Sequence, residues 1–94
     1  MPLFILAAID MPDSLELRAA TRSEHLAFAE NNPMVRLGGP FLDDAGSPIG
    51  SMFILEAEDR EAAVAFAAAD PYAKAGLFES TTIRAWRKVL GDLS

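Results

Sequence analysis

Apolar residues form two uninterrupted runs along the chain, and both runs have the length of a strand. The first run, Leu3–Ile9, has a proline before it and a turn sequence after it, so we expect a strand that is buried on both faces. The second run, Met52–Leu55, lies inside a strand expected over Ile49–Glu56. A half-exposed strand alternates apolar with polar positions, and these runs do not. Something is therefore expected to cover both faces of the sheet.

Two segments between the strands predict helices, and polar residues mark where each helix begins. Asp13 is the expected N-cap of the first helix, with Glu16 as its capping-box partner, and this helix should reach about Glu30. Asp59 is the expected N-cap of the second helix. The second helix should run to about Ala69, because a proline that follows cannot continue it.

The remaining strands complete a β-α-β-β-α-β order in a single domain of residues 1–94. Strands are expected over Met34–Phe41, interrupted by Gly38-Gly39-Pro40, and over Thr81–Leu90. This order is the ferredoxin-like α+β arrangement with an antiparallel sheet. Two helices cover only one face of such a sheet, and the same face of a second copy is the simplest cover for the other, which predicts a homodimer. The alternative is that some of these apolar residues are exposed.

Composition narrows the range of partners. The chain has 14 Asp and Glu against 8 Lys and Arg, and its net charge of -6 would repel the phosphates of nucleic acid. No apolar run approaches the roughly 20 residues of a membrane span, and the N-terminus lacks the basic region of a signal peptide, so we expect a soluble, cytoplasmic protein without a membrane partner. No cysteine and a single histidine argue against a zinc site. We expect neither a metal nor a cofactor.

The single histidine, His25, lies on the first helix beside two arginines. The helical period places Arg22 inside an apolar stripe and Arg18 and His25 along its edge. An arginine buried in this way needs an acidic or anionic partner. The residues that define the stripe are Leu15, Ala19, Leu26 and Ala29.

Asp70 provides the matching charge on the second helix. It falls on the inward stripe of Ala63, Phe66 and Ala67, at the helix C-terminus, where the helix dipole disfavours a carboxylate. His25 and Arg22 are its candidate partners. An aspartate that binds one imidazole nitrogen fixes the tautomer and raises the basicity of the other nitrogen, which suits a general base. The pattern alone leaves a catalytic pair and a structural packing pair both open.

Four stretches of the chain resemble the YciI-like family. Arg22-Ser23-Glu24-His25-Leu26 is similar to an R-x-x-H-L stretch, and Gly39-Pro40 is similar to the Gly-Pro after the family's second strand. The segment Asp70–Phe78 matches D-P-Y-x-x-A-G-L-F in full and is the most specific part. Ile83-Arg84-Ala85-Trp86 resembles I-R-P-[FW] in the last strand, with Ala85 in place of the usual proline. The resemblance covers nearly the whole chain.

The resemblance implies a dimeric α+β barrel with a site centred on His25 and Asp70. A few members resemble cofactor-free lyases that eliminate chloride from a chlorinated hydroxyquinol. We therefore expect a small cofactor-independent enzyme of lyase or isomerase type that moves a proton on a small anionic or phenolic molecule. His25 would be the base or acid, Asp70 its orienter and Arg22 the anion holder. The other expected substrate-binding residues are Arg18, Tyr72, Gly39 and Pro40.

One alternative is a non-enzymatic small-molecule binding or regulatory module that uses the same pocket. Another is a related monooxygenase-like barrel, which oxygen uptake with quinol substrates would test. Tyr72 either places a phenol over the pocket or packs as a core aromatic. Ser51 has no neighbouring motif that would make it a nucleophile, and we interpret it as an ordinary strand residue. Turnover separates the enzyme from the binding module, because a binder needs the pocket without a titrating histidine.

Overall fold

Four strands form one antiparallel sheet in the computed structural model of the protein, which describes residues 1–91. Their spatial order is β2-β3-β1-β4, so the first and third strands along the chain lie in the middle. This confirms the ferredoxin-like β-α-β-β-α-β arrangement. The strands are β1 (Leu3–Asp10), β2 (Val35–Leu42), β3 (Pro48–Glu56) and β4 (Phe78–Trp86).

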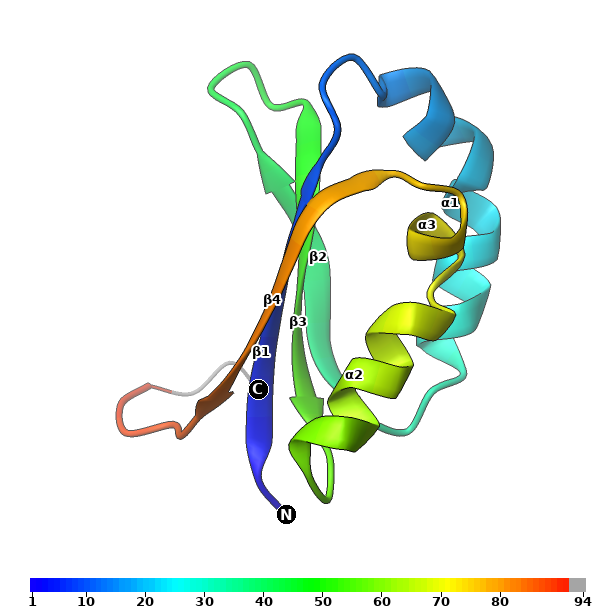
Figure 1. Cartoon of the computed structure of the whole chain (residues 1–94). Coiled ribbons are helices and arrows are strands. Elements are labelled where there is room, and N and C mark those ends of the chain that lie inside the picture. The colour runs from blue at the N-terminus through cyan, green and yellow to red at the C-terminus, as the bar shows by residue number, and fades with distance from the viewer. Residues whose placement is uncertain (92–94) are drawn as a thin grey trace.

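The helices all lie on one face of the sheet and leave the other face uncovered (Figure 1). They are α1 (Leu15–Glu30), α2 (Arg60–Ala69) and the short α3 (Pro71–Lys74). The last of these was not predicted. Within the described residues, no helix has the length and the apolar character needed to cross a membrane.

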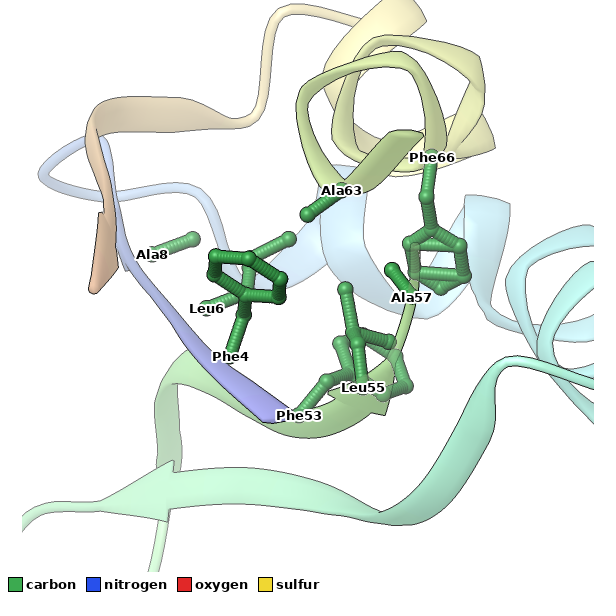
Figure 2. Close-up of a cluster of buried hydrophobic side chains, with 8 residues drawn as sticks. All are labelled: Phe4, Leu6, Ala8, Phe53, Leu55, Ala57, Ala63 and Phe66. Carbon is green, nitrogen blue, oxygen red and sulfur yellow. The ribbon is translucent and has the colours of Figure 1, made fainter. Parts of the chain in front are cut away.

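The core lies between α2 and the central strands, where aromatic and aliphatic side chains meet (Figure 2). In β1 the buried residues are Phe4, Leu6 and Ala8, which point toward the helices. The residues that alternate with them, Leu3, Ile5 and Ala7, are only partly buried. The prediction of a strand buried on both faces is therefore wrong for the single chain. The open face is the one that the predicted dimer would cover, and the dimer stays a prediction.

Of the two predicted helix N-caps, one is confirmed and the other is wrong. Asp59 is the N-cap of α2, as predicted, and its side chain accepts a hydrogen bond from the backbone N–H of Ala62 at 2.9 Å. Asp13 does not cap α1, since it adopts a φ of 56° in the preceding turn and Ser14 occupies the N-cap position. The predicted capping box with Glu16 is wrong, because no side chain makes a cap hydrogen bond at this helix end.

Pairing with β1 sets the bounds of the last strand. Phe78 pairs with Asp10 and Trp86 pairs with Leu3, so β4 extends for the length of its partner. The prediction of a strand over Thr81–Leu90 began too late and ended too late. The ladder ends where Trp86 pairs with Leu3, the first residue of β1.

Candidate functional site

A pocket of about 670 Å³ lies against α1, with residues of β2 and β3 forming much of its remaining wall. This volume falls in the range of sites for small molecules. Most of the wall is apolar, and a few polar side chains interrupt it. The polar residues of the wall include Arg18, Arg22, His25, Ser51 and Tyr72.

Helix α1 presents its apolar stripe to this pocket, and of the stripe residues Ala29 also packs against the core. Leu15, Ala19, Leu26 and Ala29, which defined the predicted stripe, all line the pocket. The buried positions of the helix are instead Arg18, Thr21 and His25. The predicted placement of the two arginines is therefore reversed: Arg18 is buried, while Arg22 is exposed and lines the pocket.

His25 and Asp70 form the predicted pair, brought together by α1 and the α2–α3 junction. Nδ1 of His25 lies 2.8 Å from Oδ1 of Asp70, and both side chains are largely buried. The same oxygen accepts a hydrogen bond from the backbone N–H of Tyr72 at 2.9 Å. Asp70 is thus the N-cap of α3 as well as the C-cap of α2, which compensates its unfavourable place at the end of α2.

The carboxylate determines which imidazole nitrogen is free. An ionised carboxylate only accepts hydrogen bonds, so Nδ1 of His25 donates, and a neutral ring carries its lone pair on Nε2. Within residues 1–91, Nε2 has no hydrogen-bond partner. Every fully buried side-chain nitrogen or oxygen in these residues does have a partner, so Nε2 is not fully buried. It follows that Nε2 is accessible, on a ring that lines the pocket. This is the arrangement of a general base.

Arg18 is held by an acidic partner that the sequence analysis did not find. Its Nε donates to Asp10 Oδ2 at 2.8 Å, and its Nη2 donates to the carbonyl oxygen of Gly50 at 2.6 Å and to Ser51 Oγ at 2.7 Å. Asp10 ends β1 where the register with β4 shifts. No periodicity along the chain signals this pairing, because Arg18 lies on α1 while these partners lie on β1 and β3.

Tyr72 is both a packing residue and part of the pocket wall, so the two predicted alternatives hold together. It is 1% exposed, and its ring stacks on His25 with a centroid distance of 3.9 Å and an interplanar angle of 18°. Arg18 lies over the same ring, with Cζ 4.6 Å from the centroid. Burial raises the pKa of the Tyr72 hydroxyl above its usual value, against the opposing effect of Arg18 and Arg22.

The remaining predicted residues also reach the pocket. Gly39 and Pro40 line it from β2. Arg22 makes no ion pair and no side-chain hydrogen bond within the described part of the chain, so its charge is available to a ligand. In residues 1–91, no three His, Cys, Asp or Glu side chains are grouped in a way that would hold a metal ion.

Comparisons with known proteins show which family model, sequences and folds this chain is similar to. Residues 2–87 match the model of the YCII-related domain. Protein YciI of Escherichia coli is 36% identical over 96 residues, an alignment that covers 93% of this chain and 98% of that protein.

Two solved structures share the fold. The 5-chloro-2-hydroxyhydroquinone dehydrochlorinase of Burkholderia phenoliruptrix, in complex with 2,5-dihydroxybenzoquinone, matches with a TM-score of 0.81 and 35% identity. The match covers 90% of this chain and 93% of that one. An antibiotic biosynthesis monooxygenase matches with a TM-score of 0.59 and 18% identity. This match covers 96% of this chain and 100% of that one, and it concerns the fold alone.

Proposed function

This chain belongs to the YCII-related domain family, and we propose that it is a cofactor-independent enzyme that moves a proton on a small phenolic or anionic molecule. The observation that carries the proposal is the 2.8 Å hydrogen bond between His25 and Asp70, beside an accessible Nε2 at the pocket wall. A buried histidine that only packs has no need of a free nitrogen in a cavity. A histidine that acts as a base requires one.

The proposed step uses both carboxylate and imidazole. His25 Nε2 takes a proton from an O–H or C–H of the substrate, and the electron pair of that bond moves into the substrate. In a lyase reaction a leaving group such as chloride then departs with its bonding electron pair; in an isomerase reaction the proton returns at another atom. Asp70 stabilises the imidazolium through the hydrogen bond to Nδ1. The N–H of Tyr72 holds the carboxylate in place.

The pocket supports a planar, oxygenated substrate of modest size. Its wall is mostly apolar, with Leu26 and Phe53 among the lining residues, and this favours a ring. The free charge of Arg22 favours an anionic oxygen on that ring. The dehydrochlorinase, whose structure contains 2,5-dihydroxybenzoquinone, supports the same class of molecule for this chain.

We also propose that the enzyme is a homodimer formed through the open face of the sheet. Leu3, Ile5, Ile54 and Trp86 share this face, since Leu3 pairs with Trp86 and Ile5 with Ile54 across the strands. Trp86 is 40% exposed in the single chain. Sedimentation equilibrium should give about twice the chain mass of 10.1 kDa. A monomer at micromolar concentration would contradict this proposal. The cytoplasmic location expected from the sequence also stays a prediction.

The function is tested with two reactions. Chloride release from 5-chloro-2-hydroxyhydroquinone reports elimination, and exchange of the ring hydrogens of 2,5-dihydroxybenzoquinone for deuterium, followed by NMR, reports proton transfer alone. We expect the wild type to accelerate at least one of them and Asp70→Asn to lower that rate by more than tenfold, as a misoriented base would. Glu61→Gln, the same carboxylate-to-amide change at an exposed residue of α2 outside the pocket wall, is the matched control and should leave the rate unchanged. Equal rates with and without the protein would contradict the proposal.

A further inference from the structure

The residues of the pocket wall outside the His25–Asp70 pair include Tyr72, with its hydroxyl, and Arg18, with its Nη1, and these two hydrogen-bond donors lie next to each other. We propose that these two groups together bind the substrate oxygen on which negative charge develops when His25 removes the proton. This inference rests on the proposed function and adds one chemical requirement to the proposed substrate. The substrate must carry a phenolic or enolic oxygen that becomes an oxyanion.

Arg18 is fixed so that Nη1 is its uncommitted end. Nε and Nη2 donate to Asp10, to the carbonyl oxygen of Gly50 and to Ser51, with distances from 2.6 to 3.4 Å. Within residues 1–91, Nη1 has only the hydroxyl oxygen of Tyr72 within reach, at 3.5 Å, and this is the longest hydrogen bond of the guanidinium. A donor with such a long contact gains from a closer, negatively charged acceptor.

The phenolic proton of Tyr72 lacks an acceptor. Within residues 1–91 the hydroxyl has one hydrogen-bond partner, Arg18 Nη1, and a guanidinium only donates. A buried O–H without an acceptor is unfavourable by about 1–3 kcal/mol, and a ligand oxygen in the pocket would remove that cost. The same burial raises the pKa of the hydroxyl, so the group stays protonated near neutral pH and can donate.

The donors and the base are close enough to act on one ligand, because the rings of Tyr72 and His25 stack at 3.9 Å and both residues line the same pocket. When Nε2 of His25 takes the proton from a substrate C–H or O–H, the electron pair ends on the substrate oxygen. That oxygen then accepts from the Tyr72 hydroxyl and from Arg18 Nη1. The charges balance: the imidazolium is neutralised by Asp70, and the oxyanion lies against two donors that are already oriented.

The experiment compares two probes of matched shape with wild-type protein and Tyr72→Phe. 4-Nitrophenolate carries the anionic oxygen, and 4-nitrotoluene replaces it with a methyl group. We expect Tyr72→Phe to weaken 4-nitrophenolate binding by roughly 10- to 100-fold, the effect of removing one hydrogen bond to a charged oxygen, and to leave 4-nitrotoluene binding unchanged. The control Glu61→Gln, at an exposed residue of α2 outside the pocket wall, should bind both probes as the wild type does. Arg18→Lys, if it folds, should show the same selective loss, because an ammonium lacks the planar Nη1 edge.

Three results would overturn the inference: equal loss of both probes, which would make Tyr72 a packing residue; no loss of either; or no preference of the wild type for the phenolate. The proposed function has a separate readout, since it depends on turnover with His25 intact. A His25→Gln protein that keeps its preference for 4-nitrophenolate but has lost turnover supports both. A Tyr72→Phe protein that keeps the preference, in an enzyme whose turnover depends on His25, overturns the oxyanion site alone.

Discussion

The layer between the sheet and the helices is filled under α2 and hollow beside α1. Under α2 the side chains of Phe4, Leu55 and Phe66 pack together with almost no exposure (Figure 2). Beside α1, residues of the same apolar kind, such as Leu26, line a pocket of about 670 Å³. The two halves show that an apolar helix face can either pack in a core or line a pocket. Substitutions in the two halves should therefore have different consequences.

The largest expected effect on stability is in the filled half. Phe66→Ala should lower the free energy of unfolding by about 3–5 kcal/mol, because it leaves a cavity among close-packed rings. Leu26→Ala, the matched change in the hollow half, should lower it by only about 1 kcal/mol or less, since its side chain already borders open space. Urea denaturation measures both values. Similar losses for the two variants would break the distinction between the halves.

The next largest effect on stability is expected at Asp70, where α2 ends and α3 begins. Asp70→Asn removes the negative charge that accepts hydrogen bonds from His25 and from the Tyr72 N–H. We expect a loss of about 1–3 kcal/mol in the free energy of unfolding, because two buried donors lose a charged acceptor. The fold should survive, since an amide oxygen still accepts one bond. A variant as stable as the wild type, measured by the same denaturation, would show that the carboxylate is not holding the junction.

The smallest effect, a change in ligand affinity without a change in stability, is expected at Arg22, whose exposed side chain lines the pocket. Arg22→Gln should leave stability unchanged and weaken the binding of an anionic ligand such as 4-nitrophenolate by roughly two- to fivefold, as for an exposed ion pair. The difference should shrink with added salt, because counterions screen exposed charges. Titration calorimetry at low and high salt tests this. The exposed Arg36, which pairs with Glu56, is the control: Arg36→Gln should leave binding unchanged.

The contrast between the halves also explains which features the sequence could predict. The inward stripe of α2 and its Asp59 cap were predicted correctly, because a helix over a filled core places its apolar residues inside. The same reasoning on α1 misplaced Arg18 and Arg22, because an apolar stripe beside a pocket looks the same in the sequence as one beside a core. Hydropathy reports which side chains avoid water and not what they contact.

Contacts between segments that are distant in the sequence are a second kind of feature that the sequence could not predict. Asp10 accepts from Arg18 across two elements, and nothing in the local sequence signals that partnership. The bounds of β4 likewise depend on where β1 begins. Helix α3 was missed although a signal was present: Asp70 followed by Pro71 is a typical helix start, with an N-cap and a proline in the first turn.

The central claim is that His25 moves a proton, and one measurement tests it most directly: ligand affinity and turnover of the same His25→Gln protein. We expect the variant to fold and to bind 2,5-dihydroxybenzoquinone with nearly wild-type affinity, because glutamine retains much of the volume and can still donate to Asp70. Turnover should fall by roughly 10²–10⁴-fold, the usual contribution of a positioned acid or base. A folded variant that retains full turnover would contradict the claim and leave the domain as a binding module.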